Sequence, residues 1–243
     1  MTTPTPPTLI SARAAGVIYL AIIALGLFGE VFVRGSLVVA GDMAATASNI
    51  LGSQLLWRSG IATDLVMHVL DVPLIVFFYL LLKPVSYPLA LLATVFNIVQ
   101  TCVLAVNKLS LVAALSLLNS PVFAAGQVDS QAFALLAVNL HGHGFGIGLI
   151  FFGLACLVRG YLILHSGYVP RALGVLLALA GMGYLVNSFA LLLSPRLASM
   201  LFPAVLLPAF VAELALSLWL LFANQRVLQQ RLAKAGSRVA AST

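Results

Sequence analysis

Six long runs of apolar residues constrain the fold of this chain more than any other feature. A helix needs about 20 apolar residues to cross the hydrocarbon core of a bilayer, and in lipid only a helix or a closed barrel satisfies its own backbone hydrogen bonds. Charged residues make up only 7% of the chain, against about 25% in a soluble domain. We therefore predict an all-α polytopic membrane bundle of six transmembrane helices. The predicted spans are residues 14–33, 58–82, 87–117, 133–160, 170–193 and 199–222.

The lysines and arginines near the ends of these runs predict the orientation of the bundle, because cytoplasmic loops carry the excess of positive charge. If the spans alternate in direction, eight basic residues lie on the side of the two termini and three lie on the other side. The eight are Arg13, Lys83, Arg159, Arg171, Arg226, Arg231, Lys234 and Arg238, and the three are Arg34, Arg58 and Arg196. Both termini are therefore expected in the cytoplasm.

The transmembrane domain is predicted to occupy residues 13–222. The Pro- and Thr-rich tail 1–12 cannot form a core and is expected to be disordered, whereas residues 223–243 form a basic cytoplasmic tail. The first apolar run is too long for the apolar region of a signal peptide, so we expect it to remain as an anchor. The net charge of +6 is scattered over loops and tail, which excludes nucleic-acid binding and leaves the lipid bilayer as the expected partner.

The second predicted span carries three ionisable residues on one face. Asp64, His68 and Asp71 follow the i, i+4, i+7 spacing of a helical stripe. An ionisable group at the centre of a bilayer costs about 3 kcal/mol even on a lenient insertion scale. This face is therefore predicted to point into the bundle interior or toward water.

Other charged side chains inside the spans also need partners. Lys108 is the lysine placed well inside a span, and we expect it to pair with Asp64 on the neighbouring span because both lie in the outer part of the bilayer. Glu30 and Arg34, at i and i+4, are interpreted as a local ion pair at the membrane edge. The span with Lys108 carries a polar stripe made of Asn97, Gln100, Thr101, Asn107 and Lys108.

The fourth span contains the segment NLHGHGFGIGLIFFG. Asn139 and His143 share one helix face, whereas His141 points to nearly the opposite side, so we predict that the first two line the interior. Glycines at 142, 144, 146 and 148 are interpreted as close-packing positions between helices.

Depth in the membrane gives the predicted interior its shape. Asp71 and Glu213 lie near the centre of the bilayer, the other polar groups lie in its outer half, and the inner half is almost purely apolar. This distribution predicts a polar cavity that faces outward and closes near mid-membrane. Its predicted lining is Asp64, His68, Asp71, Lys108, Asn139, His143 and Glu213.

Several stretches of the chain resemble a known family. They are ARAAGVIYLAIIALGLFGEVFVRGSLVV, ATDLVMHVLDVPLIVFFYLLLKPV, FFGLACLVRGYLILHSGYVPRALGVLLALAGMGYLVNSF and LLPAFVAELALSLWLL. In this order they resemble an uncharacterised bacterial membrane family, domain of unknown function 4386, over most of residues 12–222. The resemblance implies a multi-pass bundle in the bacterial cytoplasmic (inner) membrane. It implies no activity and no catalytic residue.

Three functions fit these patterns. We favour small-solute binding or proton-linked transport, because an Asp/His/Asp stripe facing Lys108 can exchange protons near neutral pH; this function needs no cofactor and no catalysis. The alternative is a metal-dependent intramembrane hydrolase, since Zn²⁺ accepts nitrogen and oxygen ligands. Its ligands would be Asp64, His68, Asp71 and His143. The second alternative is a purely structural or stress-related membrane protein.

Overall fold

The computed structural model describes residues 11–120, 129–201 and 203–224, together with residues 227, 228, 230 and 232. Within this part of the chain, six helices are long and apolar enough to cross a membrane, which confirms the predicted number of spans. The predicted N-terminal tail, apart from its last residues, and the basic residues of the C-terminal tail lie outside the described residues. The chain is thus a multi-pass α-helical membrane protein.

The first three spans lie in the first half of the chain, and the first of them is built from three consecutive helical segments. The first is composed of α1 (Ala12–Leu27), a π-helical segment η1 (Phe28–Arg34) and the short α2 (Gly35–Leu37). After the surface helix α3 (Met43–Gly52), α4 (Gln54–Leu82) and α5 (Tyr87–Leu118) form the second and third spans. The first span is therefore longer than predicted, because η1 and α2 continue it beyond residue 33.

The last three spans are α7 (Ser130–Ser166), α8 (Arg171–Leu193) and α10 (Leu207–Phe222), the last preceded by the single turn η2 (Ala204–Leu206). Asp129 caps the start of α7 by accepting hydrogen bonds from two backbone amides, and Gly167, with φ 72°, ends it in the left-handed conformation. The sixth predicted span divides, because residues Pro195–Leu201 form a separate short helix, α9.

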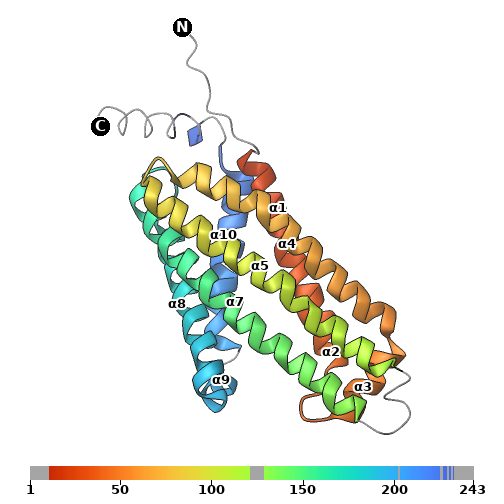
Figure 1. Ribbon diagram of the computed structural model, residues 1–243. Helices are drawn as coiled ribbons and strands as arrows, with labels where there is room; N and C mark the ends of the chain where they lie inside the picture. Colours follow the sequence, from red (N-terminus) through yellow and green to blue (C-terminus); the bar gives the residue numbers. More distant parts are fainter. Residues whose placement is uncertain are drawn as a thin grey trace.

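The six spans form a closed ring. Each span packs against the span before it and the span after it, and α10 closes the ring against α1 (Figure 1). The longest packed seams are those of α7, which lies between α5 and α8. A ring of this kind has an interior that every span borders, and it places the start of α1 and the end of α10 at the same end. We call this the inner end of the bundle and the opposite end the outer end.

Apolar residues close the inner end of the ring. One cluster of buried side chains joins α1, α4, α7, α8 and α10 there and includes Phe77, Phe78, Leu162, Leu216 and Leu220. Tyr168, in the loop between α7 and α8, donates a hydrogen bond of 2.5 Å to the backbone oxygen of Leu81. Burial raises the pKa of Tyr168, so its hydroxyl keeps the proton that it donates.

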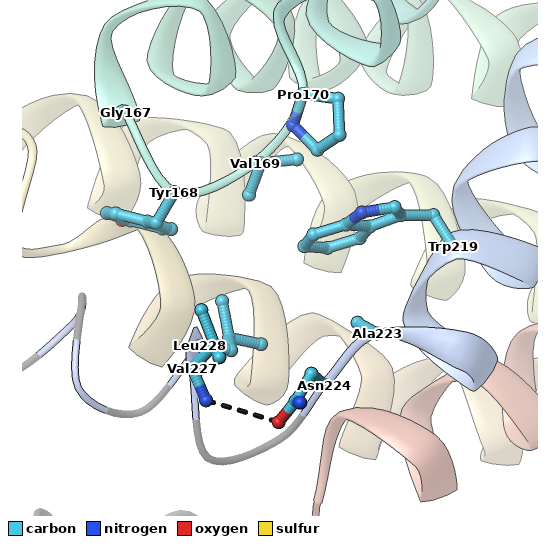
Figure 2. A pocket seen from close by; sticks show the side chains of 9 residues that line it. All are labelled: Gly167, Tyr168, Val169, Pro170, Trp219, Ala223, Asn224, Val227 and Leu228. Carbon is cyan, nitrogen blue, oxygen red and sulfur yellow. Dashed lines mark hydrogen bonds between the residues drawn. The ribbon is translucent and has the colours of Figure 1, made fainter.

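A hollow of about 370 Å³ lies beside this loop (Figure 2). The indole of Trp219 from α10 faces Val169 and Pro170 across it, and Leu228 borders it from the chain after α10. Trp and Tyr, both present in this lining, are the residues enriched where a membrane protein meets the water interface.

The contact that closes the ring depends on Gly16. A Cβ at this position would lie 2.6 Å from the backbone nitrogen of Leu221 and 2.9 Å from the backbone oxygen of Ser217. Since backbone atoms cannot move aside as a side chain can, α1 and α10 approach this closely only with glycine here.

We therefore expect Gly16→Ala to destabilise the protein by about 1–3 kcal/mol, the usual cost of overpacking a close contact. The measurement is the free energy of unfolding in mixed detergent. Gly142→Ala is the matched control, because a Cβ at that helical position meets nothing within 4 Å. Equal stability of the two variants would contradict the role assigned to Gly16.

Candidate functional site

Two cavities lie inside the ring, one above the other along its axis. The outer cavity has a volume of about 270 Å³ and the inner cavity about 150 Å³. Both are lined mainly by apolar side chains, among which a few charged and polar groups converge. The two cavities share part of their walls, namely Ile22, Met67, Phe145, Leu149, Tyr184 and Glu213.

Four charged side chains form an ion cluster at the outer cavity. Asp64 Oδ2 accepts from Lys108 Nζ at 2.9 Å and from Arg34 Nη1 at 2.6 Å. Arg34 Nε in turn lies 2.8 Å from Glu30 Oε2. Asp64 and Lys108 are only 1% and 2% exposed, so each needs the other's charge. We name Glu30, Arg34, Asp64 and Lys108 the outer ion cluster; its two positive and two negative charges balance.

The outer ion cluster confirms two expectations and corrects a third. The Asp64–Lys108 pair and the Glu30–Arg34 pair are both present. Arg34, however, was counted with the loop charges on the side away from the termini, whereas its side chain reaches into the bundle and binds Asp64. The π-helical segment η1 carries both Glu30 and Arg34, and such segments are frequent at functional sites.

Gly29 allows Asp64 to approach the first span. A Cβ at Gly29 would clash with Oδ1 of Asp64, so no larger residue fits while the carboxylate occupies its position. Asp64 Oδ1 itself has no hydrogen-bond partner among the described residues. The sequence pattern did not indicate this contact, because it depends on how the first and second spans are rotated toward each other, which chain order does not specify.

A second group of ionisable side chains lines the inner cavity. Asp71 accepts hydrogen bonds from Thr101 and, at 3.3 Å, from Asn97 Nδ2. Glu213 accepts a hydrogen bond from the hydroxyl of Tyr184. The polar stripe predicted on the third span therefore faces the interior, where Asn97, Gln100, Thr101 and Lys108 are all buried.

Arg159 is the member of this group that the sequence did not identify. It was predicted to lie among the cytoplasmic loop charges, because the fourth span was expected to end at residue 160. In the structure α7 continues to Ser166, so about 10 Å of helix separate Arg159 from the end of the span. Its side chain is 6% exposed, lies over the ring of Phe78 at 4.9 Å and lines the inner cavity.

We name Asp71, Arg159 and Glu213 the inner charge group. The inner half was expected to be almost purely apolar, and an apolar cluster does close the inner end. The buried guanidinium of Arg159, however, lies against Phe78 of that cluster. No ion pair joins Arg159 to either carboxylate among the described residues.

The histidines of the fourth span do not lie as predicted. His143 and Asn139 are exposed on the surface of the bundle, so the prediction that they line the cavity is wrong. His141 is buried instead, and Asn107 Nδ2 lies 3.0 Å from its Nδ1 and donates to its backbone oxygen at 2.8 Å. The physical reason is packing: α5 covers the face of α7 that carries Ala137 and His141.

Asn139 and His143 are exposed because α7 is longer than its neighbour α8. Gly146 lies level with Leu191, close to the end of α8, because a Cβ there would meet that side chain at 2.9 Å. The turns of α7 before Gly146 thus extend past the outer end of α8. Asn139 and His143 lie on this extension rather than within the ring.

The residues predicted as zinc ligands are not brought together. His68 and Asp71 line the inner cavity, whereas Asp64 binds two cations in the outer ion cluster and His143 is exposed. Over the described ranges, no group of three or more His, Cys, Asp or Glu side chains is placed to hold a metal ion. The geometry therefore offers no support for the hydrolase alternative.

Residues 14–223 match the family described as domain of unknown function DUF4386. The chain belongs to this family. It is also similar to an uncharacterised protein of Archaeoglobus fulgidus, with 30% identity over 121 residues, which are 49% of this chain and 59% of that protein. The chain thus spans about three fifths of the length of this relative. No solved structure matches it.

The outer ion cluster predicts an unequal effect of two substitutions. Asp64→Asn removes the carboxylate that Arg34 and Lys108 share, whereas Lys108→Gln leaves Asp64 paired with Arg34. We expect Asp64→Asn to cost about 3–5 kcal/mol, as for a broken buried ion pair, and Lys108→Gln to cost clearly less. Unfolding in mixed detergent measures both, and the reverse order would contradict the shared carboxylate.

Proposed function

We propose that this DUF4386 protein binds a small solute in the two adjacent cavities and that an exchange of one proton accompanies binding. The observation that carries the proposal is the unequal charge of the inner group. Asp71 and Glu213 supply two carboxyl groups, and Arg159 supplies one guanidinium, around a cavity of about 150 Å³. Every other charged group bordering the cavities belongs to the outer ion cluster, which is balanced.

Charge balance makes one of the two inner carboxyl groups the site of a proton. An isolated charge in a low-dielectric interior is neutralised by a change of protonation rather than tolerated. With both carboxyl groups ionised, the inner charge group would carry one excess negative charge. One proton shared between Asp71 and Glu213 removes this excess, and such coupled carboxyl groups titrate as a pair.

The lining of the cavities fits a binding site for a small, mostly apolar solute. Ligand sites are typically apolar hollows with a few converging polar groups, and sites for drug-sized ligands have volumes of about 300–1,000 Å³. Each cavity here is smaller than that range. Glu213 and Tyr184 line both cavities, so a solute in the outer cavity contacts the same two side chains as one in the inner cavity.

The rim of the outer cavity indicates where such a solute would enter. Leu27 and Glu30 from the first span and Phe210 from α10 border the cavity and are exposed on the bundle surface. The spans that carry them make their close contact at Gly16, toward the inner end. Entry would therefore occur from the outer half of the membrane. Release on the cytoplasmic side, as transport requires, would need the apolar cluster around Phe77 and Phe78 to open.

The test is the pH dependence of solute binding by the purified protein. A panel of small amphipathic solutes is screened by thermal stabilisation at acidic and alkaline pH. Solutes that stabilise the wild-type protein should do so with a strong pH dependence. In the double variant Asp71→Asn, Glu213→Gln the carboxyl pair can no longer exchange a proton, and we expect the pH dependence to disappear.

Asp42→Asn is the matched control, because Asp42 is exposed and lines neither cavity, and asparagine can keep its hydrogen bond from the Ala45 amide. This variant should keep the pH dependence of the wild type. A double variant that responds to pH as the wild type does would show that Asp71 and Glu213 hold no exchangeable proton.

A further inference from the structure

Two buried polar atoms at the inner cavity have no hydrogen-bond partner among the described residues. They are Nη2 of Arg159 and Nε2 of His68. Both side chains line the cavity, and both residues are more than nine tenths buried. A buried donor without a partner is costly, and a buried guanidinium more so. The free donor of Arg159 is therefore available to a solute in this cavity.

We propose that the inner cavity binds the carboxylate of a small organic acid, with Arg159 as the anion-binding group and the apolar body of the acid in the outer cavity. This inference rests on the proposed function and names its class of solute. A guanidinium is planar and presents a fork of donors that matches a carboxylate, often through two parallel hydrogen bonds. Phe78 fixes the guanidinium by lying under it.

A carboxylate fits the free groups of this cavity better than an amine does. The carboxyl groups of Asp71 and Glu213 already accept hydrogen bonds from Thr101, Asn97 and Tyr184. The guanidinium is the charged group that retains a free donor. An ammonium ion in the same small cavity would lie beside Arg159 and be repelled by it.

The charges of the cavity also fix the proton balance of binding. Before binding, one proton on the pair Asp71/Glu213 leaves a single carboxylate to balance Arg159. When an organic anion binds Arg159 and balances its charge, the remaining carboxylate of the pair takes up a proton from solution. One anion and one proton therefore bind together, and no charge is added to the interior.

The groups that face this pair come from every span around it. They are Tyr19 from the first span, His68 from α4, Cys156 and Arg159 from α7, and Tyr184 from α8. From α5 the neutral side chains of Asn97, Gln100 and Thr101 face it. Among these described neighbours, Arg159 supplies the permanent positive charge.

The test uses hexanoate as the probe, with hexanol and hexylamine as probes of the same apolar length. Radiolabelled hexanoate is bound to the detergent-purified full chain by equilibrium dialysis, and proton uptake is followed with a dye in weak buffer. We expect hexanoate to bind more tightly at acidic pH and to take up about one proton per bound anion. Hexanol should bind weakly and without proton uptake.

Substitutions at Arg159 identify the anion-binding group. Arg159→Gln should weaken hexanoate binding about 10- to 100-fold, the value of a charge-assisted hydrogen bond of about 1.5–3 kcal/mol. Arg159→Lys keeps the charge but loses the fork, so we expect an intermediate loss. It carries the test if Arg159→Gln does not fold. Arg171→Gln is the matched control, because Arg171 is exposed at the start of α8.

The outcomes separate this inference from the proposed function. Unchanged hexanoate binding in Arg159→Gln and Arg159→Lys, or no hexanoate binding by the wild type, would overturn the inference. Binding of hexylamine with proton release would overturn it as well, but would leave a proton-linked solute site in place. If hexanoate binds through Arg159 while the pH dependence survives in Asp71→Asn, Glu213→Gln, the anion site stands and the proton pair of the proposed function falls.

Discussion

Charged side chains at the centre of a membrane are costly to expose to lipid, and the ring of six helices is built around this constraint. Its interior holds two sets of charges at different depths. In the outer ion cluster, Asp64 binds Arg34 and Lys108 at once, and all charges balance. In the inner charge group, two carboxyl groups face one arginine. The charges of the first set balance within the fold, whereas we propose that a proton balances the second. Binding chemistry is therefore proposed for the second set.

Close helix approach makes this interior possible. Gly29 leaves room for the Asp64 carboxylate, and Gly16 lets α10 close the ring against α1. Side chains at these two positions would push apart the same helices that carry the charges. Packing and electrostatics are thus coupled: the charges are buried because the helices approach closely, and the cost of that burial is offset only because the partners come within hydrogen-bond distance.

The predictions that held and those that failed differ in kind. The Asp64–Lys108 pair was predictable, because both residues lie at one depth on consecutive antiparallel spans, and consecutive spans are usually neighbours. The roles of His141 and His143 were exchanged, because helical spacing shows which residues share a face but not which face turns inward. Arg159 was missed because α7 runs past its predicted end. A small shift of a helix boundary moved a charge from the loops into the core.

The sequence alone determined the number of spans, their α-helical state and the presence of buried charge, because a long, continuous apolar segment satisfies its own backbone in lipid only as a helix. It also limited which side chains could pair, through depth. Only the tertiary structure decided that the spans close into a ring, that Arg34 joins Asp64, and that Arg159 meets Asp71 and Glu213 at one cavity. These contacts depend on the rotation and spacing of helices, which side-chain packing across the ring sets and no local pattern encodes.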